Sequence, residues 1–355
     1  MDIQEILADP DSRRLDGLIL AAEQLRCKSL GSEVYLRGLI EFSNICRCDC
    51  FYCGLRKSNR GLRRYHLDHN QIAELARMAV QHGLPSIALQ SGEVAADKEV
   101  DFIAHVVRTM REESTRSGSP GLGITLSVGE LTYAQYQQLF EAGAHRYLLR
   151  IESSDPLLFR RIHPHSQQYE RRLECLDALK DIGFQVGTGV MIGLPGQTVE
   201  HLAADLDFFV NRDIDMLGMG PYIAHPQTPM AQTVQAVIVD PYTTTLKMMA
   251  LARLLMPDIN MVVSTALQSI HPQGLQQGVR AGGNVVMPVL TPEECRPNYS
   301  LYANKRFKTL EGLEEEVAAA GYRLAFDKWG DSHHYYRRRS LPYPDQQIDQ
   351  EKCAG

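Results

Sequence analysis

The chain has 355 residues, of which 44% are hydrophobic and 23% are charged, and its net charge is −6. This composition is that of an ordinary globular protein, and the mild acidity argues against a nucleic-acid partner. No apolar run is long enough to cross a membrane, and residues 1–20 lack the apolar core of a signal peptide, so we expect a cytoplasmic protein with no membrane partner.

Residues 1–34 predict one or two amphipathic helices, because apolar residues recur there every three or four positions. Ile3, Ile6 and Leu7 form one such set, and a second set begins at Leu15. We expect this N-terminal helical extension to cap the fold and to carry no chemistry.

Between residues 35 and 290, short apolar runs alternate with longer segments of helical periodicity. The predicted strands cover residues 35–42, 86–90, 123–127, 146–151, 185–192, 216–220, 260–264 and 284–287. The predicted helices cover residues 70–82, 99–112, 133–142, 156–162, 169–182, 199–211, 242–255 and 274–280. Repeated β-then-α units indicate a parallel sheet with helices outside, and eight of them favour one complete (βα)8 TIM-type barrel. Length alone would allow two domains, but α/β barrels of this size occur as single units.

Residues 291–355 lose this rhythm, and we expect them to form a C-terminal cap and tail with one helix over 310–320. The basic and aromatic run at residues 333–339 has the composition of a metal or nucleic-acid patch, but a solvated basic tail is the favoured interpretation. Cys353, close to the end of the chain, is expected to be unstructured.

Eight cysteines occur in the chain, and four of them lie within residues 46–53. This local cluster does not resemble the disulfide framework of a secreted protein. Cys46, Cys50 and Cys53 have C-x3-C-x2-C spacing, which lets a loop turn three thiolates toward one centre, and thiolates bind zinc or iron–sulfur clusters. Three ligands leave one iron of a four-iron cluster open to a small molecule, and we favour this interpretation. A zinc site or a redox disulfide remains open, because Cys48 supplies a fourth thiol.

Polar residues follow most of the predicted strands. In a parallel barrel, reactive groups lie at the carboxyl ends of the strands. Buried charges such as Arg150 and Glu152 are costly unless they are paired, so a purely structural barrel would not need them there. We therefore predict a binding cavity at this end of the barrel. Its candidate residues are Gln90, Ser91, Gly92, Glu93, Thr125, Ser127, Glu130, Arg150, Glu152, Pro221, Tyr222, His225, Ser264, Thr265 and Met287, with residues 191–196.

The cysteine motif and its flanks, residues 40–44 and 53–56, resemble the radical S-adenosylmethionine (SAM) superfamily. Within that superfamily they look like the HydE family of FeFe-hydrogenase maturases, whose relatives are methylornithine synthase and biotin synthase. Further segments resemble the family in the same order, at residues 89–93, 125–130, 142–150, 191–198 and 220–223. The resemblance covers residues 35–302, which is most of the predicted barrel.

This resemblance implies a [4Fe-4S] cluster held by Cys46, Cys50 and Cys53, with SAM on the open iron. The implied SAM site consists of Tyr52, Ser91, Gly92, Glu93, Glu152, Arg172, Met191 and Ile192. Arg171 competes with Arg172 for one position, but Leu173 aligns better with the family if Arg172 is the match. Some family members bind a second cluster through cysteines near the C-terminus. Residues 302–323 contain no cysteine here, so we predict a single cluster.

The resemblance also implies substrate-binding positions in the cavity beyond SAM. They are Thr125, Ser127, Arg150, Ser264, Thr265, Met287, Tyr299 and Tyr302. Hydroxyls, phenols and a guanidinium would suit a small anionic or zwitterionic substrate. The implied activity is reductive cleavage of SAM to a 5′-deoxyadenosyl radical, which acts on a small sulfur-containing substrate during maturation of the FeFe-hydrogenase cluster. The implied partners are a reductant, such as ferredoxin or flavodoxin, and other hydrogenase maturases.

Two other kinds of function remain open. A methylornithine-synthase-like mutase would use the same cluster and SAM on an amino acid, and Arg150 suits that substrate too. A non-catalytic iron–sulfur electron carrier or a zinc-binding module would use the cysteine motif without SAM. The carrier would normally have four cysteine ligands, and the zinc module would use Cys48 as its fourth.

Overall fold

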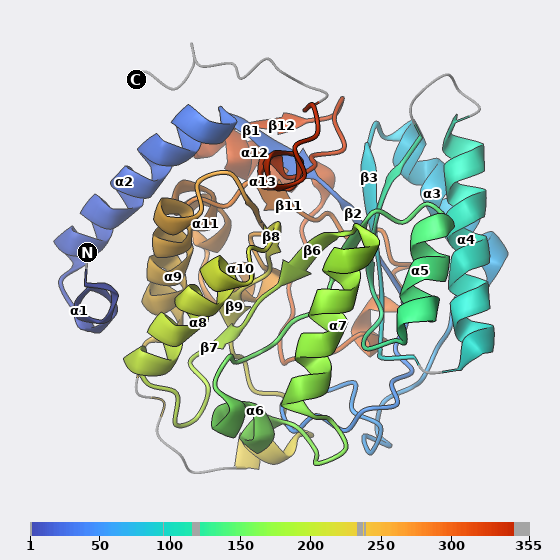
Figure 1. Ribbon diagram of the computed structural model, residues 1–355, viewed down its shortest axis with the longest axis horizontal. Helices are drawn as coiled ribbons and strands as arrows, with labels where there is room; N and C mark the ends of the chain where they lie inside the picture. Colours follow the sequence, from blue (N-terminus) through green and yellow to red (C-terminus); the bar gives the residue numbers. More distant parts are fainter. Residues whose placement is uncertain (1, 95, 116–120, 233–236, 238, 344–355) are drawn as a thin grey trace.

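The computed structural model describes residues 2–94, 96–115, 121–232, 237 and 239–343. Its centre is a curled sheet of seven parallel strands in the order β10-β8-β6-β5-β4-β3-β2 (Figure 1). These strands are β2 (Gly38–Ser43), β3 (Ser86–Ser91), β4 (Gly123–Ser127), β5 (Arg146–Leu148), β6 (Gln185–Thr188), β8 (Met216–Leu217) and β10 (Asn260–Met261). The predicted α/β architecture with a parallel sheet is confirmed.

Helices follow the strands and cover the outside of the sheet. They are α3 (His69–Gln81), α4 (Asp97–Thr115), α5 (Tyr133–Glu141), α6 (Pro156–Ile162), α7 (Tyr169–Ile182), α8 (Val199–Asn211), α9 (Pro241–Leu255) and α11 (Gly274–Arg280). Asp68 and Thr132 start α3 and α5 with capping boxes, in which each side chain accepts from the backbone N–H three residues later. In the ranges that the structure describes, no helix is long and apolar enough to cross a membrane.

Three of the predicted strands are divided. Residues 35–42 form β1 (Glu33–Leu36) and β2, residues 185–192 form β6 and β7 (Met191–Ile192), and residues 216–220 form β8 and β9 (Gly220–Pro221). Two of the breaks lie at Gly189 and Gly218, where a side chain on Gly189 would collide with the carbonyl oxygen of Gly218. Beyond these glycines, β7 and β9 pair with each other in a separate two-stranded sheet.

The segment after α11 contacts both edges of the main sheet. β11 (Val285–Val286) pairs with β1, Val289 bridges Leu39 of β2, and Val285 bridges Val262 just beyond β10. The predicted strand 260–264 is shorter than expected, because Ser264 already caps a helix, α10 (Thr265–Ile270), that the sequence reasoning missed. The Ser264 hydroxyl accepts from the backbone N–H of Leu267.

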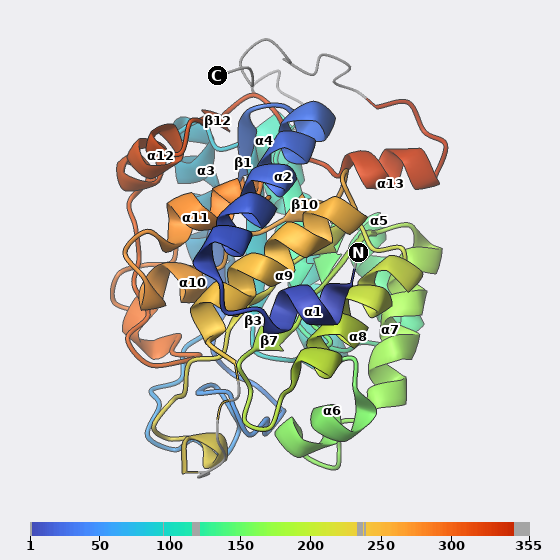
Figure 2. The same ribbon diagram turned by 90° about the vertical axis from the view of Figure 1, so that its left-hand side faces the viewer.

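Two N-terminal helices cover one side of the molecule, as predicted. α1 (Ile3–Ala8) packs on α8 and α9, and α2 (Ser12–Leu30) packs on α9 (Figure 2). Lys247 of α9 holds this region, because its ammonium group donates to the carbonyl oxygen of Leu7 at 3.1 Å. The domain boundaries expected near residues 34 and 290 stay predictions.

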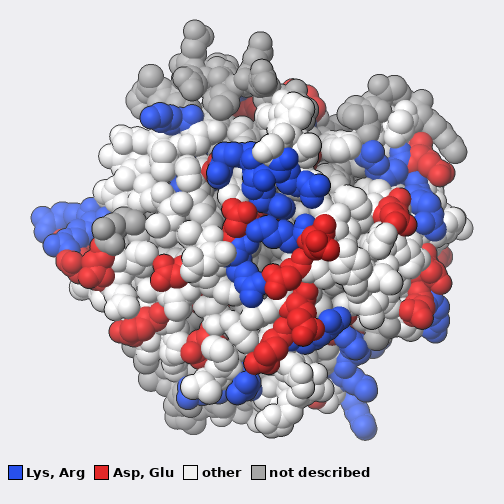
Figure 3. Space-filling model, viewed as in Figure 1, with Lys and Arg blue, Asp and Glu red and all other residues white. Residues whose placement is uncertain are grey.

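The C-terminal region is more structured than the sequence suggested. α12 (Leu310–Ala319) is followed by β12 (Arg323–Ala325), which pairs with β1, and by α13 (His333–Arg338). The expectation that residues 333–339 form a solvated basic tail is wrong: Lys and Arg side chains gather over α13 with Asp and Glu side chains beside them (Figure 3). Cys353 lies outside the described residues.

Ion pairs fix α13 to the amino ends of the barrel strands. Arg338 donates two hydrogen bonds of 2.7 Å to the buried carboxylate of Asp215, which lies just before β8. His334 lies between Asp213, at 2.8 Å, and Asp258, at 3.2 Å. Because these carboxylates are far from α13 in sequence, local composition could not reveal that they neutralise it.

Candidate active site

The four clustered cysteines lie on a loop, residues 44–64, that follows β2 at the carboxyl end of the sheet. We call these residues the cysteine loop. Arg64 organises the loop, because its guanidinium donates to the carbonyl oxygens of Asn44, Leu55, Arg56 and Asn59 at 2.6–3.3 Å. A guanidinium with its fixed fork of donors can hold several carbonyls at once. The loop therefore has a defined shape before any ligand binds.

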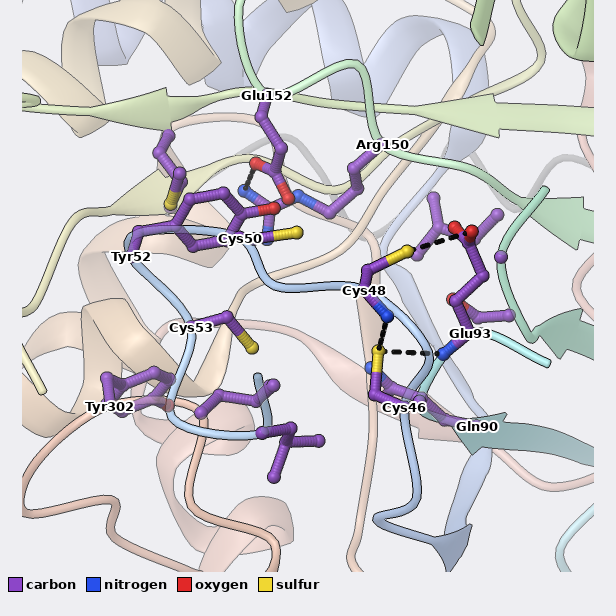
Figure 4. A pocket seen from close by; sticks show the side chains of 18 of the residues that line it. Cys46, Cys48, Cys50, Tyr52, Cys53, Gln90, Glu93, Arg150, Glu152 and Tyr302 are labelled. Carbon is purple, nitrogen blue, oxygen red and sulfur yellow. Dashed lines mark hydrogen bonds and ion pairs between the residues drawn. The ribbon is translucent and has the colours of Figure 1, made fainter. Parts of the chain in front are cut away.

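Cys46, Cys50 and Cys53 all line one cavity at the carboxyl ends of the strands (Figure 4). The Cys48 side chain and the backbone N–H groups of Cys48 and Glu93 lower the pKa of Cys46 to about 7. Burial raises the pKa of the Cys50 thiol and raises that of Cys53 to about 12. Buried thiols are stable as thiolates only beside a cation, and a coordinating metal supplies that charge.

The placement of the thiols fits a cluster better than a single ion. Among the residues that the structure describes, no three His, Cys, Asp or Glu side chains are gathered around one metal position. A four-iron cluster does not need such convergence, because each thiolate binds a different iron. Cys48 has another partner, since its thiol donates to Glu93 Oε1 at 3.0 Å (Figure 4). The donor set is therefore compatible with three cluster ligands and a fourth, hydrogen-bonded thiol.

The end of β3 packs directly against the cysteine loop. A Cβ atom on Gly92 would lie 2.6 Å from Cys46 Cβ and closer still to the carbonyl oxygen of Ile45, so only glycine fits. The close approach that requires a glycine here is therefore to the loop itself. Beside it, Glu93 Oε1 lies 2.9 Å from Arg47 Nε. Ser91, Gly92 and Glu93 all line the cavity.

Glu152 lies across the cavity in a strained backbone conformation. Its φ of 66° is rare for a residue with a side chain, and hydrogen bonds with Gly189 and Met191 hold it there. Glu152 Oε2 is 3.0 Å from Arg150 Nη2, but this buried oxygen makes no hydrogen bond within the described structure. Burial raises the pKa of Glu152. A strained residue whose buried, ion-paired carboxylate lines a cavity is a good candidate for ligand binding.

The structure distinguishes Arg172 from Arg171. Arg172 is buried and lines the cavity, where its Nε lies 2.6 Å from Glu130 Oε1 and its Nη1 donates to the carbonyl oxygen of Arg150. Arg171 is partly exposed, and it pairs with Glu174 and donates to the carbonyl oxygen of Leu131 at 2.6 Å. Of the two, only Arg172 lines this cavity.

Most of the expected site residues come together in this cavity. Besides the three cysteines, the lining contains Tyr52, Ser91, Gly92, Glu93, Glu152, Arg172, Met191, Ser127, Arg150, Ser264, Tyr299 and Tyr302. Tyr52 is held by its ring contact and a 3.4 Å hydrogen bond with the buried His163.

Four of the residues expected to bind SAM or substrate do not line it, and neither do the cavity candidates Glu130, His225 and residues 193–196. Ile192 is buried in the main core, because it alternates with Met191 along the strand. Thr125 lies two residues before Ser127 on β4 and therefore deeper in the sheet. There its hydroxyl accepts a hydrogen bond from Arg146 Nε at 2.9 Å. Met287 packs against an apolar cluster around Val285. Thr265 lies behind Tyr302, which lines the cavity, and the two hydroxyls are 2.8 Å apart.

Sequence reasoning missed one residue beside the cysteines. Gln167, in the turn before α7, accepts from the Cys50 thiol at 3.0 Å. It does not follow a strand, and nothing in its local sequence marks it as a site residue. The buried hydroxyl of Tyr222, at a predicted strand end, lines the same cavity and has no hydrogen-bond partner among the described residues.

Comparisons with known proteins agree with this geometry. Residues 40–209 match the model of the radical SAM superfamily. The [FeFe] hydrogenase maturase subunit HydE of Thermotoga maritima is 43% identical over 85% of this chain and 83% of its own length. The 3-methylornithine synthase of Methanosarcina acetivorans is 25% identical over 89% of each chain. Among solved structures, methylornithine synthase superposes with a TM-score of 0.77 at 22% identity, covering 91% of this chain and 93% of that one. These similarities confirm the resemblance inferred from the cysteine motif and its flanks.

Proposed function

This chain is a radical SAM enzyme of the HydE family, and from that premise we propose that it uses a SAM-derived radical in maturation of the FeFe-hydrogenase active-site cluster. Its substrate is a small sulfur-containing molecule. The observation that carries the proposal is one cavity with three cysteines on one side and the buried Glu152 carboxylate on the other, in a chain 43% identical to a HydE protein.

We propose that Cys46, Cys50 and Cys53 hold a single [4Fe-4S] cluster. When bound, the cluster supplies the electron that cleaves SAM to methionine and a 5′-deoxyadenosyl radical. Three described cysteines lie outside the cysteine loop: the Cys175 thiol is 3.7 Å from the carbonyl oxygen of Leu131, that of Cys27 is 3.8 Å from the Tyr322 hydroxyl, and Cys295 stands alone in the C-terminal region. This distribution supports one cluster.

Charged groups around the cavity suit the ammonium and carboxylate groups of SAM. Glu93, at the end of β3, and Glu152 accept hydrogen bonds from donors of the ligand, including the ammonium group. Arg172, already oriented by Glu130, donates to the ligand carboxylate, since a guanidinium binds a carboxylate through paired hydrogen bonds. Pre-positioned partners reduce the side-chain ordering that binding costs.

Other groups would position the adenine. Tyr52, held against His163, lies beside this ring, and Met191 contacts it. Ser91 and Gly92 complete the SAM site through their backbone. Ile192 takes part only through its backbone, because its side chain is buried in the core.

The substrate would occupy the same cavity beyond SAM. Ser127, Arg150, Ser264, Tyr299 and Tyr302 line this part and offer hydroxyls and one guanidinium to a small zwitterion. Thr265 acts through Tyr302, and Thr125 and Met287 shape the walls from behind. We propose that residues 284–290 close the sheet into a complete (βα)8 barrel, which would keep a reactive radical away from water.

The partners we propose follow from this chemistry. An electron carrier such as ferredoxin or flavodoxin reduces the cluster, and another hydrogenase maturase supplies the substrate. A reducing cytoplasm suits the partly exposed thiols of the cysteine loop. Neither nucleic acid nor membrane takes part.

A methylornithine-synthase-like mutase is the second candidate, because that enzyme shares the fold with a TM-score of 0.77 and Arg150 would suit an amino-acid carboxylate. The non-catalytic alternatives are disfavoured, because a zinc module or a four-cysteine carrier needs Cys48 as a ligand, whereas its thiol donates to Glu93. To test the assignment, cysteine-derived thioethers or iron–cysteine complexes and diamino acids are each added to reconstituted enzyme, and 5′-deoxyadenosine is measured. Stimulation by the sulfur compounds supports the proposal, and stimulation by diamino acids alone overturns it in favour of the mutase.

The role of Cys48 is tested separately through the metal content. The variant Cys48→Ser should retain iron and sulfide at the wild-type level, whereas Cys50→Ser should lose them. Loss of iron in Cys48→Ser to the same extent as in Cys50→Ser would make Cys48 a ligand and restore the four-cysteine alternatives.

A further inference from the structure

The cysteine loop carries more positive charge than the chain as a whole. Residues 44–64 contain six Lys or Arg and one Asp, although the net charge of the protein is −6. Three of these cations have structural roles: Arg47 pairs with Glu93, Arg56 pairs with Asp49 at 2.9 Å, and Arg64 binds the loop carbonyls. Lys57, Arg60 and Arg63 are exposed, and the structure of the described residues gives their side chains no partner. Their charge is available to a partner.

Helix α6 adds cations next to the same loop. The backbone N–H of Phe51 donates to the carbonyl oxygen of Ile162 at 2.9 Å, so the last turn of α6 contacts the stretch between Cys50 and Cys53. Arg160 and Arg161 precede this contact and are exposed. Arg160 is 3.5 Å from Glu170, with both side chains more than half exposed, and no ion pair of Arg161 is found within the described structure.

We define the cationic rim as Lys57, Arg60, Arg63, Arg160 and Arg161. Figures 1 and 2 place the cysteine loop and α6 at the same end of the molecule, and the cysteine loop lines the cavity. Two apolar side chains on the same segments are exposed: 51% of Ile45 and 63% of Leu157 are accessible. The neighbouring acids Asp49 and Glu93 are already paired with Arg56 and Arg47. This end of the molecule therefore combines exposed positive charge with two exposed apolar side chains.

We propose that the cationic rim is the docking surface for an acidic electron-transfer protein that carries a flavin or an iron–sulfur centre. This inference rests on the proposed function. The reduced carrier loses one electron through this face, and that electron is consumed when the C–S bond of SAM breaks. Charge complementarity steers encounters between redox partners and raises association rates by about 10–1,000-fold, while such interfaces stay small and transient. The rim is made of the loop that holds the thiols, so a carrier bound there would lie beside the proposed cluster.

Binding of an oxidised carrier tests the surface without any SAM chemistry. The probe is acidic flavodoxin in its oxidised FMN form, titrated into the full reconstituted chain by calorimetry. The double variant Lys57→Glu/Arg161→Glu should weaken binding at least about tenfold at low salt, where charges act over about 30 Å, and high salt should abolish the difference. The neutral variant Lys57→Gln/Arg161→Gln should give an intermediate loss. The matched control Lys28→Glu/Arg108→Glu reverses two exposed cations on α2 and α4 and should change binding less than about twofold.

A second readout separates this surface from the chemistry of the site. Cleavage of SAM driven by dithionite should be the same in the rim variant and the wild type, whereas cleavage driven by reduced flavodoxin should fall at least about tenfold. Equal losses with both reductants, or equal effects of the rim and control variants on flavodoxin binding, would overturn the docking surface. Tighter binding of single-stranded nucleic acid than of flavodoxin at the rim would overturn it too. Absence of dithionite-driven cleavage in the wild type would instead refute the proposed function, and the calorimetric comparison would still decide the docking surface.

Discussion

Gly92 is the point where β3 meets the cysteine loop, and substituting it tests how the loop is positioned. In Gly92→Ala the new Cβ would lie 2.6 Å from Cys46 Cβ, closer than real Cβ contacts, which essentially never fall below 3.0 Å. The atom nearest to the new Cβ is the backbone carbonyl oxygen of Ile45, which cannot rotate away as the end of a flexible side chain could. The loop must therefore move by several tenths of an ångström, and Cys46 moves with it.

Overpacking of this kind costs about 1–3 kcal/mol of stability. Because Cys46 is a proposed cluster ligand, we expect Gly92→Ala to show a loss of this size in the free energy of unfolding, measured with denaturant under anaerobic conditions. We also expect less iron and sulfide per chain after reconstitution. The 5′-deoxyadenosine yield should fall at least in proportion to the iron.

Gly17→Ala is the matched control, because nothing lies within 4 Å of a Cβ at this helical position in α2. Alanine is the better helix former, so this variant should gain roughly 0.5–1 kcal/mol and keep its iron. If Gly92→Ala bound as much iron as Gly17→Ala and was equally stable, the close approach of β3 would not position Cys46.

Two further predictions concern stability. Burial raises the pKa of Asp205 in α8 to about 7 from an unfolded value of 3.8, so the unfolded chain releases this proton first and stability should fall as pH rises from about 4 to 7. The loss is at most roughly 4 kcal/mol, and Asp205→Asn should remove this pH dependence in denaturant titrations; an unchanged slope would refute it. Arg338→Ala leaves the buried Asp215 carboxylate unpaired and should cost about 3–5 kcal/mol, whereas the exposed Arg339→Ala should cost less than about 1 kcal/mol. Equal denaturation midpoints for Arg338→Ala and Arg339→Ala would mean that the Arg338–Asp215 ion pair does not hold α13 on the barrel.

The sequence predicted best where local signals are strong. The bounds of α6, α7 and α11 agree with the predicted ranges, and Asp155 followed by Pro156 is the kind of start signal that fixes a helix. The cysteine motif was recognised for a similar reason, because its spacing lies within one loop. Periodicity also gave the parallel α/β architecture.

What the sequence could not give depends on contacts between distant segments. Gln167 meets Cys50 only because α6 folds back on the cysteine loop, and α13 is held by carboxylates more than 70 residues away in the chain. Thr125 was expected in the cavity because it lies near the end of a predicted strand and matches a family position, but its depth along β4 places it beside Arg146 instead. Strand position predicts the face of a side chain, whereas depth depends on how far each strand extends.

One measurement tests the central claim most directly. The anaerobic protein is reconstituted with iron and sulfide, reduced with dithionite and mixed with SAM, and 5′-deoxyadenosine is quantified by chromatography, with Cys50→Ala as the control. We expect product from the wild type and none from the variant, because Cys50 is one of three proposed ligands. An intact, reducible cluster that gives no product and does not change spectrally when SAM is added would contradict the account.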